Sequence, residues 1–329
     1  MSILFVGGEP GDFAASSTAT GYSTVTAYRR TAYSRCSLDT STSSYYYDTP
    51  ALATEHWTTF RYYFGATAGT TANFWTLRYG SADLVHIKIV SLGSSSTYGI
   101  YTVNSGTETL RATSTDSLAS STMYKLDIHV NYSASGEITL YANGNSLVSY
   151  TGDIPTLCGS PTIDSLINRF RSAVSSGYTG ISEVVIMTTD TRNISGVITK
   201  YPTGAGAYTS GFGSATYTTV ADYSLDSVYA TSTVAGETIT YSTQATTITS
   251  SPSIMAVVER MNVYASTVSP MSIIPNIYTN SSLVSGSTVS PSTQSTIIID
   301  QTWTSNPITG SAWTTSEISS LQLGATSAT

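Results

Sequence analysis

Charged residues are scarce in this chain of 329 residues, because Asp, Glu, Lys and Arg together make up only 10% of it. Ordinary soluble domains carry about 25%. The chain has 13 Lys and Arg against 20 Asp and Glu, for a net charge of −7. No basic stripe is available to neutralise a phosphate backbone, so the composition argues against a nucleic-acid partner. Active sites gather ionisable groups, and their scarcity therefore indicates a structural or binding protein.

Cysteine and long apolar runs are also nearly missing. Cys36 and Cys158 are the two cysteines, and they lie far apart with no C-x-x-C pair. This excludes a disulfide framework and the common metal and redox motifs, so we expect two buried free thiols. No apolar stretch approaches the length of about 18 residues that a membrane span needs, so no membrane insertion is expected. The N-terminus lacks the basic start and apolar stretch of a signal peptide, which predicts synthesis in a cytoplasm.

Serine, threonine and the 24 tyrosines make up much of the chain instead. Thr, Tyr and Val suit pleated strands, and Ser with Gly suits the turns between them. Strand-like runs recur throughout, and residues 84–89 and 123–132 alternate polar and apolar side chains. Two helical turns are predicted, over residues 163–170 and over 313–321, where Thr314 or Thr315 can cap the helix.

The length predicts about two domains at roughly 150 residues each. A Gly-rich, apolar-poor stretch, residues 193–215, separates two series of strands and reads as a connector. We therefore predict an all-β chain, with a jelly-roll sandwich over residues 1–192 and a smaller β-sandwich over residues 216–329. Short strands with turns, and no long intervening helices, are typical of sandwiches and jelly rolls.

The usual catalytic motifs are not found. Jelly rolls that hydrolyse glycans place paired carboxylates about 5 Å apart, often from E-x-D-x-E on one strand, and no such motif occurs. Four single carboxylates on strands are interpreted as solvated surface: Asp83, Glu108, Asp127 and Glu137. The three histidines share no metal spacing, and His86 and His129 are interpreted as exposed sheet residues. No catalytic residue, cofactor or metal site is predicted.

One feature suggests binding. Tyr45, Tyr46 and Tyr47 form a run of three rings, and tyrosine rings can stack on sugar faces while their hydroxyls form hydrogen bonds. The same run could instead be buried in the sandwich or lie in a subunit interface, where tyrosine is enriched.

Two stretches resemble known families. Residues 110–118, 123–130 and 136–144 are similar to the central strands of concanavalin A-like (laminin-G-like) jelly rolls. The ending W-x-x-N-P-x-T-G-x-x-W-T-x-x-x-I-x-x-L-x-x-G, residues 303–324, resembles the C-terminus of tailed-bacteriophage virion proteins, as residues 254–265 also do. The resemblance implies a phage structural protein with no defined catalytic residue.

From these observations we predict a non-enzymatic virion protein, a tail fibre or baseplate-associated adhesin that contacts the host surface. The alternatives are a capsid decoration protein and, third, a polysaccharide depolymerase, which the lack of an acidic pair disfavours. The expected partners are other virion proteins, further copies of the chain in a homo-oligomer (a trimer as the candidate state), and a host surface glycan. The expected location is the virion, after synthesis in the host cytoplasm.

Overall fold

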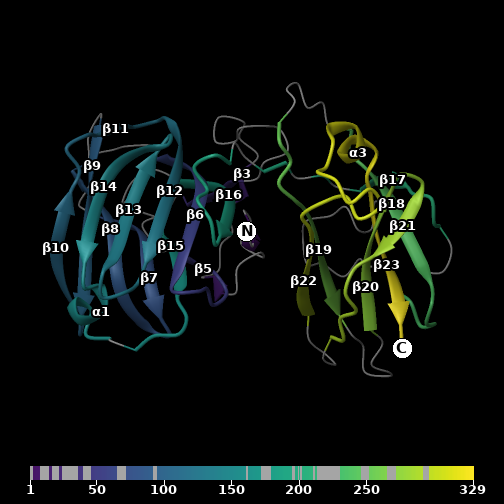
Figure 1. Ribbon diagram of the computed structural model, residues 1–329, viewed down its shortest axis with the longest axis horizontal. Helices are drawn as coiled ribbons and strands as arrows, with labels where there is room; N and C mark the ends of the chain where they lie inside the picture. The colour runs from purple at the N-terminus through teal and green to yellow at the C-terminus, as the bar shows by residue number, and fades with distance from the viewer. Residues whose placement is uncertain are drawn as a thin grey trace. The chain divides into compact units, whose positions relative to one another are not determined.

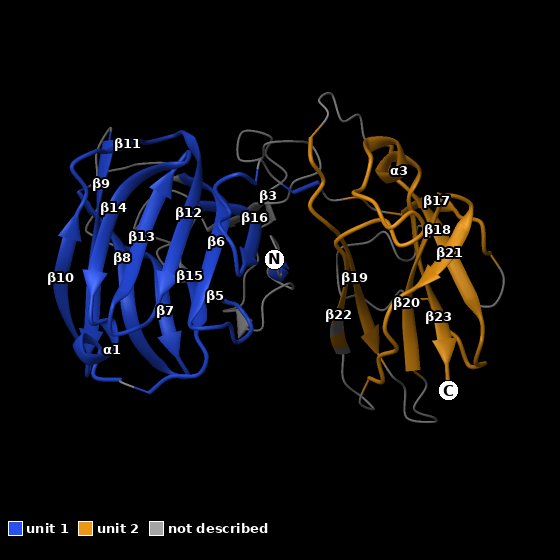
Figure 2. Cartoon of the chain, viewed as in Figure 1, with its two compact units in different colours: residues 1–198 blue, residues 199–329 orange. Residues whose placement is uncertain are grey.

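The structure is a computed structural model, and it divides into unit 1 (Met1–Ile198) and unit 2 (Thr199–Thr329), coloured separately in Figure 2. Strands dominate both units (Figure 1), so the predicted all-β class, a jelly roll followed by a smaller sandwich, is confirmed. The residues described by the structure are 3–7, 15–16, 22–23, 36–39, 46–64, 72–91, 95–160, 162–171, 179–194, 197–198, 200, 202–209, 212, 230–245, 252–264, 272–291 and 296–329.

Unit 1 contains two antiparallel sheets, called sheet A and sheet B below. In order of hydrogen-bonded neighbours, sheet A contains β14 (Asn145–Gly152), β13 (Gly136–Ala142), β12 (Met123–Asn131), β6 (Glu55–Phe64), β16 (Thr179–Met187), β4 (Cys36–Asp39) and β3 (Tyr22–Ser23), with β1 (Ile3–Gly7) also paired to β16. Sheet B contains β10 (Thr107–Thr113), β9 (Ser95–Asn104), β8 (Ala82–Ser91), β7 (Ala72–Tyr79), β15 (Ile167–Arg171), β5 (Tyr46–Asp48) and β2 (Ala15–Ser16), with β11 (Leu118–Ala119) paired to β9. The short helix α1 (Ile154–Leu157) follows β14.

Aromatic side chains from both sheets form the centre of the unit 1 core. Phe60 of sheet A meets Phe170 of sheet B edge to face, with ring centroids 5.1 Å apart. Tyr62 lies 5.1 Å from Phe74, which in turn lies 5.6 Å from Tyr98. All five are fully buried. Each such ring pair adds about 0.5–1.5 kcal/mol beyond the area it buries, so this ladder holds the two sheets together.

A polar group also crosses the core. His56 of β6 is fully buried, with Nδ1 2.8 Å from the Ala53 carbonyl and Nε2 3.2 Å from Oδ1 of Asn168 on β15. Asn168 donates to the Thr58 hydroxyl at 2.8 Å. Burial lowers the pKa of His56, which keeps the imidazole neutral near pH 7. His56 is therefore a hydrogen-bonded core residue.

Unit 2 contains a five-stranded sheet in the order β17 (Pro202–Ala205), β18 (Thr238–Thr243), β23 (Gln322–Ala328), β20 (Ser272–Thr279) and β21 (Ser282–Ser285), and a pair formed by β19 (Val257–Tyr264) and β22 (Thr296–Trp303). Its core is a cluster of Ile277, Trp303, Trp313, Ile318 and Leu321. Because β17 lies within the stretch predicted as a connector, residues 202–205 belong to a sheet. The other proposed domain limits stay predictions.

The helix predicted over residues 313–321 is confirmed as α3 (Thr315–Ser320). Thr314 is the N-cap, its hydroxyl accepts from the backbone N–H of Glu317, and the Glu317 carboxylate accepts from the Thr314 N–H, which completes a capping box. The helical turn predicted over residues 163–170 is wrong. Residues 167–171 form β15, because pairing with β7 and β5 on its two sides outweighs a weak local helical pattern.

A buried asparagine organises the C-terminal motif of unit 2. The Asn306 side chain is fully buried, donates to Oε1 of Glu317 at 2.7 Å, and accepts from the Ile308 N–H at 2.8 Å. Gly310 closes the turn with a φ of 69°, which favours glycine. The Trp313 indole N–H then donates to the Trp303 carbonyl at 3.1 Å. The spacing of this motif is thus explained by the turn and helix cap it forms.

We predict that Asn306→Ala destabilises unit 2 by about 2–3 kcal/mol, because it removes a fully buried side chain together with its bonds to Glu317 and the Ile308 N–H. Asn280→Ala is the matched control, since exposed Asn280 donates to the same Glu317 oxygen, at 3.2 Å. It should cost less than about 0.5 kcal/mol. Chemical denaturation of the full chain measures both, and equal losses would contradict the assigned role of Asn306.

Glu259 makes the stability of unit 2 depend on pH. This carboxyl group on β19 is buried and accepts only the Gly324 N–H, at 3.1 Å, among the described residues, and burial raises its pKa well above the ordinary 4.5. The folded state therefore holds a proton that the unfolded state releases. This contribution is fully present below pH 4.5 and is lost as pH rises toward the folded-state pKa.

Glu259→Gln should remove that pH dependence and stabilise unit 2 at pH 7, because the amide carries no charge to bury. Hydrogen–deuterium exchange of β19 and β23 peptides in the full chain, from about pH 4 to pH 8, measures it after correction for the intrinsic exchange rate. Glu237→Gln, at a partly exposed carboxylate, is the control. If hydrogen exchange at neutral pH were as fast in Glu259→Gln as in the unaltered chain, the proposed destabilisation by the Glu259 charge would be wrong.

Candidate functional site

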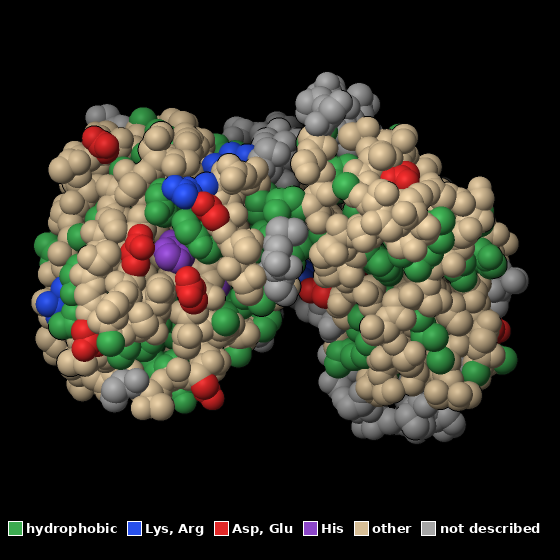
Figure 3. All heavy atoms as spheres, viewed as in Figure 1, with side chains coloured by type: hydrophobic (Ala, Val, Ile, Leu, Met, Phe, Trp, Pro, Cys, Tyr) green, Lys and Arg blue, Asp and Glu red, His purple; other side chains and the backbone are tan. Residues whose placement is uncertain are grey.

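The pairing of β6 with β12 determines which side chains reach the outer face of sheet A. In this antiparallel register Trp57 lies opposite His129, Thr59 opposite Asp127, and Arg61 opposite Lys125. Successive side chains of a strand point to opposite faces, so these six share the outer face while Leu126, Ile128 and Val130 fill the core. Figure 3 shows a histidine with acidic and basic side chains close by on the visible face of unit 1.

Three stacked rings form the centre of this face, and we call Trp57, His129 and Tyr141 the aromatic platform. The Trp57 and His129 rings are nearly parallel, with centroids 4.3 Å apart and planes inclined by 17°. Tyr141 of β13 stacks on Trp57 at 5.6 Å. All three side chains are half-buried, so each keeps part of its ring surface in solvent. The three rings therefore hold one another in place, and the His129 side chain is 13% exposed.

Carboxylates lie at both nitrogens of the His129 ring. Nε2 is 3.7 Å from Oε1 of Glu55, and Nδ1 is 3.6 Å from Oε2 of Glu137. Two hydroxyl groups of sheet A orient Glu137. The Thr139 hydroxyl donates to Glu137 Oε1 at 2.5 Å and itself lies 2.6 Å from the Ser149 hydroxyl. The arrangement places two acids around one imidazole on a face open to solvent.

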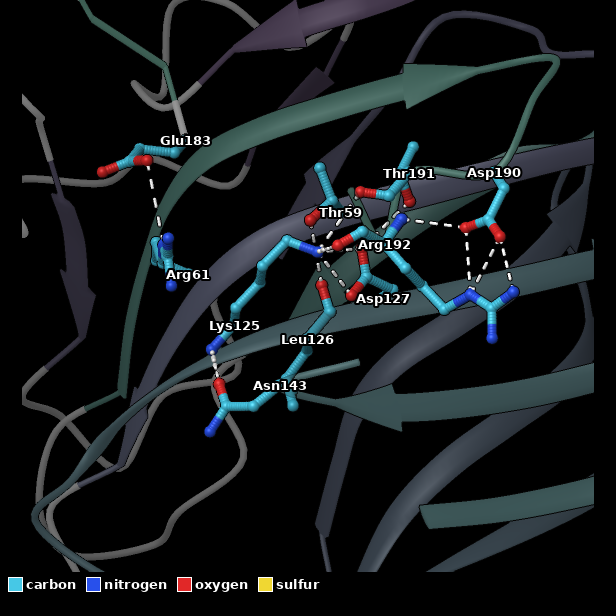
Figure 4. A network of polar contacts seen from close by, with 10 residues as sticks. All are labelled: Thr59, Arg61, Lys125, Leu126, Asp127, Asn143, Glu183, Asp190, Thr191 and Arg192. Carbon is cyan, nitrogen blue, oxygen red and sulfur yellow. Dashed lines mark hydrogen bonds and ion pairs between the residues drawn. The ribbon is translucent and has the colours of Figure 1, made fainter. Parts of the chain in front are cut away.

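A guanidinium group covers one side of the platform. Arg192 follows β16 and lies over the Tyr141 ring at 4.7 Å and over the Trp57 ring at 5.3 Å, within the range of cation–π attraction. The same guanidinium donates to the Asp190 carboxylate, from Nε at 2.9 Å and from Nη2 at 2.5 Å. Figure 4 shows Asp190 and Arg192 beside Thr191.

A buried ammonium group fixes the turn that carries Arg192. Lys125 Nζ donates to both oxygens of Asp127 at 2.7 Å, to the Thr191 carbonyl at 3.2 Å and to the Arg192 carbonyl at 3.1 Å (Figure 4). The Thr191 hydroxyl also donates to Asp127, at 3.0 Å. Burial lowers the pKa of Lys125, while hydrogen bonding to Asp127 opposes that shift. A buried pair is tolerated only with such extra bonds, and here they tie the turn to sheet A.

A β-bulge aims another acid at this face. The β16 register shifts between Ser182 and Val185, and Glu183 has a φ of 54°, which is uncommon outside glycine. Bulges re-aim side chains, and Glu183 here lies 3.8 Å from Nε of Arg61 and accepts the Val197 N–H at 3.1 Å. Arg61 thereby has its own carboxylate partner.

The groups on the platform can move protons in both directions. Burial raises the pKa of Tyr141, so its hydroxyl stays protonated at neutral pH and can donate. A histidine side chain is the residue best suited to accept a proton near pH 7. The sequence predicts strands at Trp57 and Tyr141 and a single solvated carboxylate at Glu137, but no site that joins them. The alternation of residues 123–132 indicated an exposed face, but not which strand lies beside it.

Sheet B carries a different arrangement on its outer face. Acidic and basic groups alternate in one chain of contacts across the strands, in the order Arg169, Asp48, Arg78, Asp83, His86, Glu108 and Lys88. The interpretation of Asp83, Glu108 and His86 as separate solvated residues is therefore corrected. The interpretation of Asp127 as solvated surface is corrected too, because this residue is fully buried. The sequence gives no indication that neighbouring strands supply the missing partners.

The tyrosine run predicted to bind is only partly described. Tyr46 lies in β5, with the Arg169 guanidinium 3.8 Å from its ring centroid. The backbone of Tyr47 pairs with Phe170, and Tyr45 lies outside the described residues. Contact of these tyrosines with a glycan stays a prediction.

Within the described ranges, no group of three or more His, Cys, Asp or Glu side chains is placed to hold a metal ion. Over the same part of the chain, no helix has the length and apolar character that a membrane crossing requires. Cys158 is buried, and its thiol donates to the Leu84 carbonyl at 3.0 Å.

No protein-family model and no curated protein matches the sequence. Solved structures do match. They include an alginate lyase from Alteromonas sp. 272 (11% identical, covering 44% of this chain and 78% of that one, TM-score 0.30) and one from Corynebacterium sp. (11%, 52%, 83% and 0.34). The T. cruzi calreticulin globular domain also matches (11%, 49%, 72% and 0.31). At these identities the likeness is one of fold, a jelly-roll sandwich.

The predicted non-enzymatic virion role, as tail fibre, baseplate adhesin or capsid decoration, is corrected by this comparison. Several matched structures are polysaccharide lyases, which are enzymes, and nothing found links the chain to phage proteins. The prediction rests on single ionisable residues, whereas strand pairing gathers Glu55, His129 and Glu137. The expected virion partners, trimer, host glycan and virion location stay predictions.

Lys125→Met should destabilise unit 1 by about 3 kcal/mol, because it leaves the Asp127 carboxylate buried without its cation. Lys88→Met is the matched control, since Lys88 pairs with the more exposed Glu108 and should cost less than about 1 kcal/mol. Guanidinium denaturation of the full chain measures both losses. Similar values for the two variants would contradict the anchoring role of Lys125.

Proposed function

We propose that the outer face of sheet A binds a polysaccharide and cleaves it by acid–base chemistry at the aromatic platform. One observation carries this proposal: Trp57, His129 and Tyr141 stack on a half-exposed face, with carboxylates at both imidazole nitrogens. The fold likeness to polysaccharide lyases adds no weight of its own, because many functions share one fold.

The binding half follows from the shape and chemistry of the platform. The rings stack on one another, so their outer edges offer apolar area at little entropic cost, and the C–H groups of a sugar can pack against those edges. Hydroxyl groups around the sugar need hydrogen-bonding partners. Glu55, Glu137, Ser149 and the Tyr141 hydroxyl supply donors and acceptors beside the rings. An extended chain can therefore lie along the sheet with successive sugars packed or hydrogen bonded.

The cleavage half assigns one role to each ionisable group. His129 accepts a proton from a water that attacks the anomeric carbon. In a uronate alone, where the carboxylate acidifies the neighbouring C5–H, it can instead accept that proton in an elimination. Tyr141 donates a proton to the glycosidic oxygen as its bond to carbon breaks, which balances the transfer. Glu55 and Glu137 stabilise the imidazolium that forms. Arg192, which lies over Tyr141 and Trp57, bounds one side of the space where the sugar binds.

The test incubates the purified full chain with a neutral glucan, a chitin oligosaccharide and a polyuronate, and measures new reducing ends. His129→Ala should lower cleavage by about 100-fold or more, as loss of a general base does. Trp57→Ala should weaken binding by about tenfold, or roughly 1.4 kcal/mol. His86→Ala, on the outer face of sheet B, is the control and should retain cleavage.

The products distinguish the two routes, because elimination leaves a double bond that absorbs ultraviolet light and hydrolysis does not. Binding that depends on Trp57 without any new ends would refute cleavage and leave only recognition. Cleavage that survives His129→Ala would place the chemistry elsewhere on the chain.

A further inference from the structure

We infer that the aromatic platform prefers polymers of amino sugars with free amines over polymers of uronic acids. This inference rests on the proposed function and names the substrate class of that site. It follows from the charges that the described residues leave unpaired by Lys or Arg on the outer face of sheet A.

The cations of this face already have partners. Arg61 lies 3.8 Å from Glu183, Lys125 lies 2.7 Å from Asp127, and Arg192 holds Asp190 at 2.5 Å. Lys125 is also buried, with its hydrogens directed to Asp127 and two carbonyl groups. None of the three is available as an uncompensated positive charge for a carboxylate of the substrate.

Two acids on the same face have no Lys or Arg partner among the described residues. Among ionisable groups Glu55 lies near the His129 ring, and Glu137 lies near the His129 ring and Tyr141. Their side chains are 63% and 34% exposed. The platform therefore carries a charge of −2 when His129 is neutral and −1 when it is protonated. The neighbouring β14 has no charged residue to offset this, and the whole chain carries −7.

This charge discriminates between sugars that are otherwise alike in shape. A primary ammonium group offers three donors, and its hydrogen bonds to carboxylates are stronger than neutral ones. A uronate brings a further carboxylate to Glu55 and Glu137, and like charges in contact suppress binding. Because the acids are exposed, salt should screen both effects.

The experiment measures binding of three probes to the full chain by calorimetry: a glucosamine hexamer, its fully N-acetylated counterpart, and a galacturonate hexamer. The first two share one backbone and differ in charge. At low salt the glucosamine hexamer should bind about tenfold more tightly than the N-acetylated one, and the galacturonate hexamer more weakly than both. High salt should reduce the differences.

Glu55→Gln and Glu137→Gln should each reduce the ratio of the two affinities, glucosamine over N-acetylglucosamine. Glu108→Gln, an acid of sheet B, is the matched control and should leave the ratio unaltered. The three substitutions are at partly or well exposed side chains, and circular dichroism checks that each variant is folded.

The outcomes separate this inference from the function it rests on. If no probe binds, or if Trp57→Ala weakens none of them, the platform is not a glycan site and the proposed function fails. If the probes bind through Trp57 but the galacturonate hexamer binds as tightly as the glucosamine hexamer, the charge preference is overturned and the glycan site stands.

Discussion

The antiparallel register between β6 and β12 is the constraint on which unit 1 depends. It places Phe60 and Leu126 in the core and, by the same alternation, Trp57 and His129 outside. A slip of one residue would reverse both sets, exposing core side chains and burying an imidazole with its acids. The aromatic core therefore selects the register, and the register builds the platform. Stability and the candidate site are specified by one set of pairings.

Charged residues are few in this protein, but most of those described in unit 1 form ion pairs. The few ionisable groups of unit 1 are concentrated on the two outer faces of the sandwich, and most are in contact with a partner of opposite sign. Lys125 connects the fold to the candidate site, because its buried ammonium group joins sheet A to the turn that carries Arg192. The desolvation that this ammonium costs is offset by bonds that also place the guanidinium over Trp57 and Tyr141.

Sequence alone could predict the elements far better than the site. Alternation identified the strands around residues 84–89 and 123–132, and the cap at Thr314 identified α3, because both signals are local. The strand at Ile167–Arg171 was mistaken for a helical turn, since its stability comes from β7 and β5. The candidate site could not be predicted from the sequence for a related reason. Glu55 lies far from His129 along the chain, and pairing of β6 with β12 brings it beside the ring. Arg192 is also distant in sequence and reaches Trp57 and Tyr141 only in the fold.

The C-terminal motif shows why a specific sequence pattern need not point to a function. Its Asn306 and Gly310 close one turn, Thr314 caps one helix, and the two Trp residues fill one small core. These letters are therefore accounted for by packing and hydrogen bonding within unit 2. Likeness in that stretch therefore describes how unit 2 folds. What the protein does has to be argued from exposed groups such as the platform, where packing leaves the choice of side chain open.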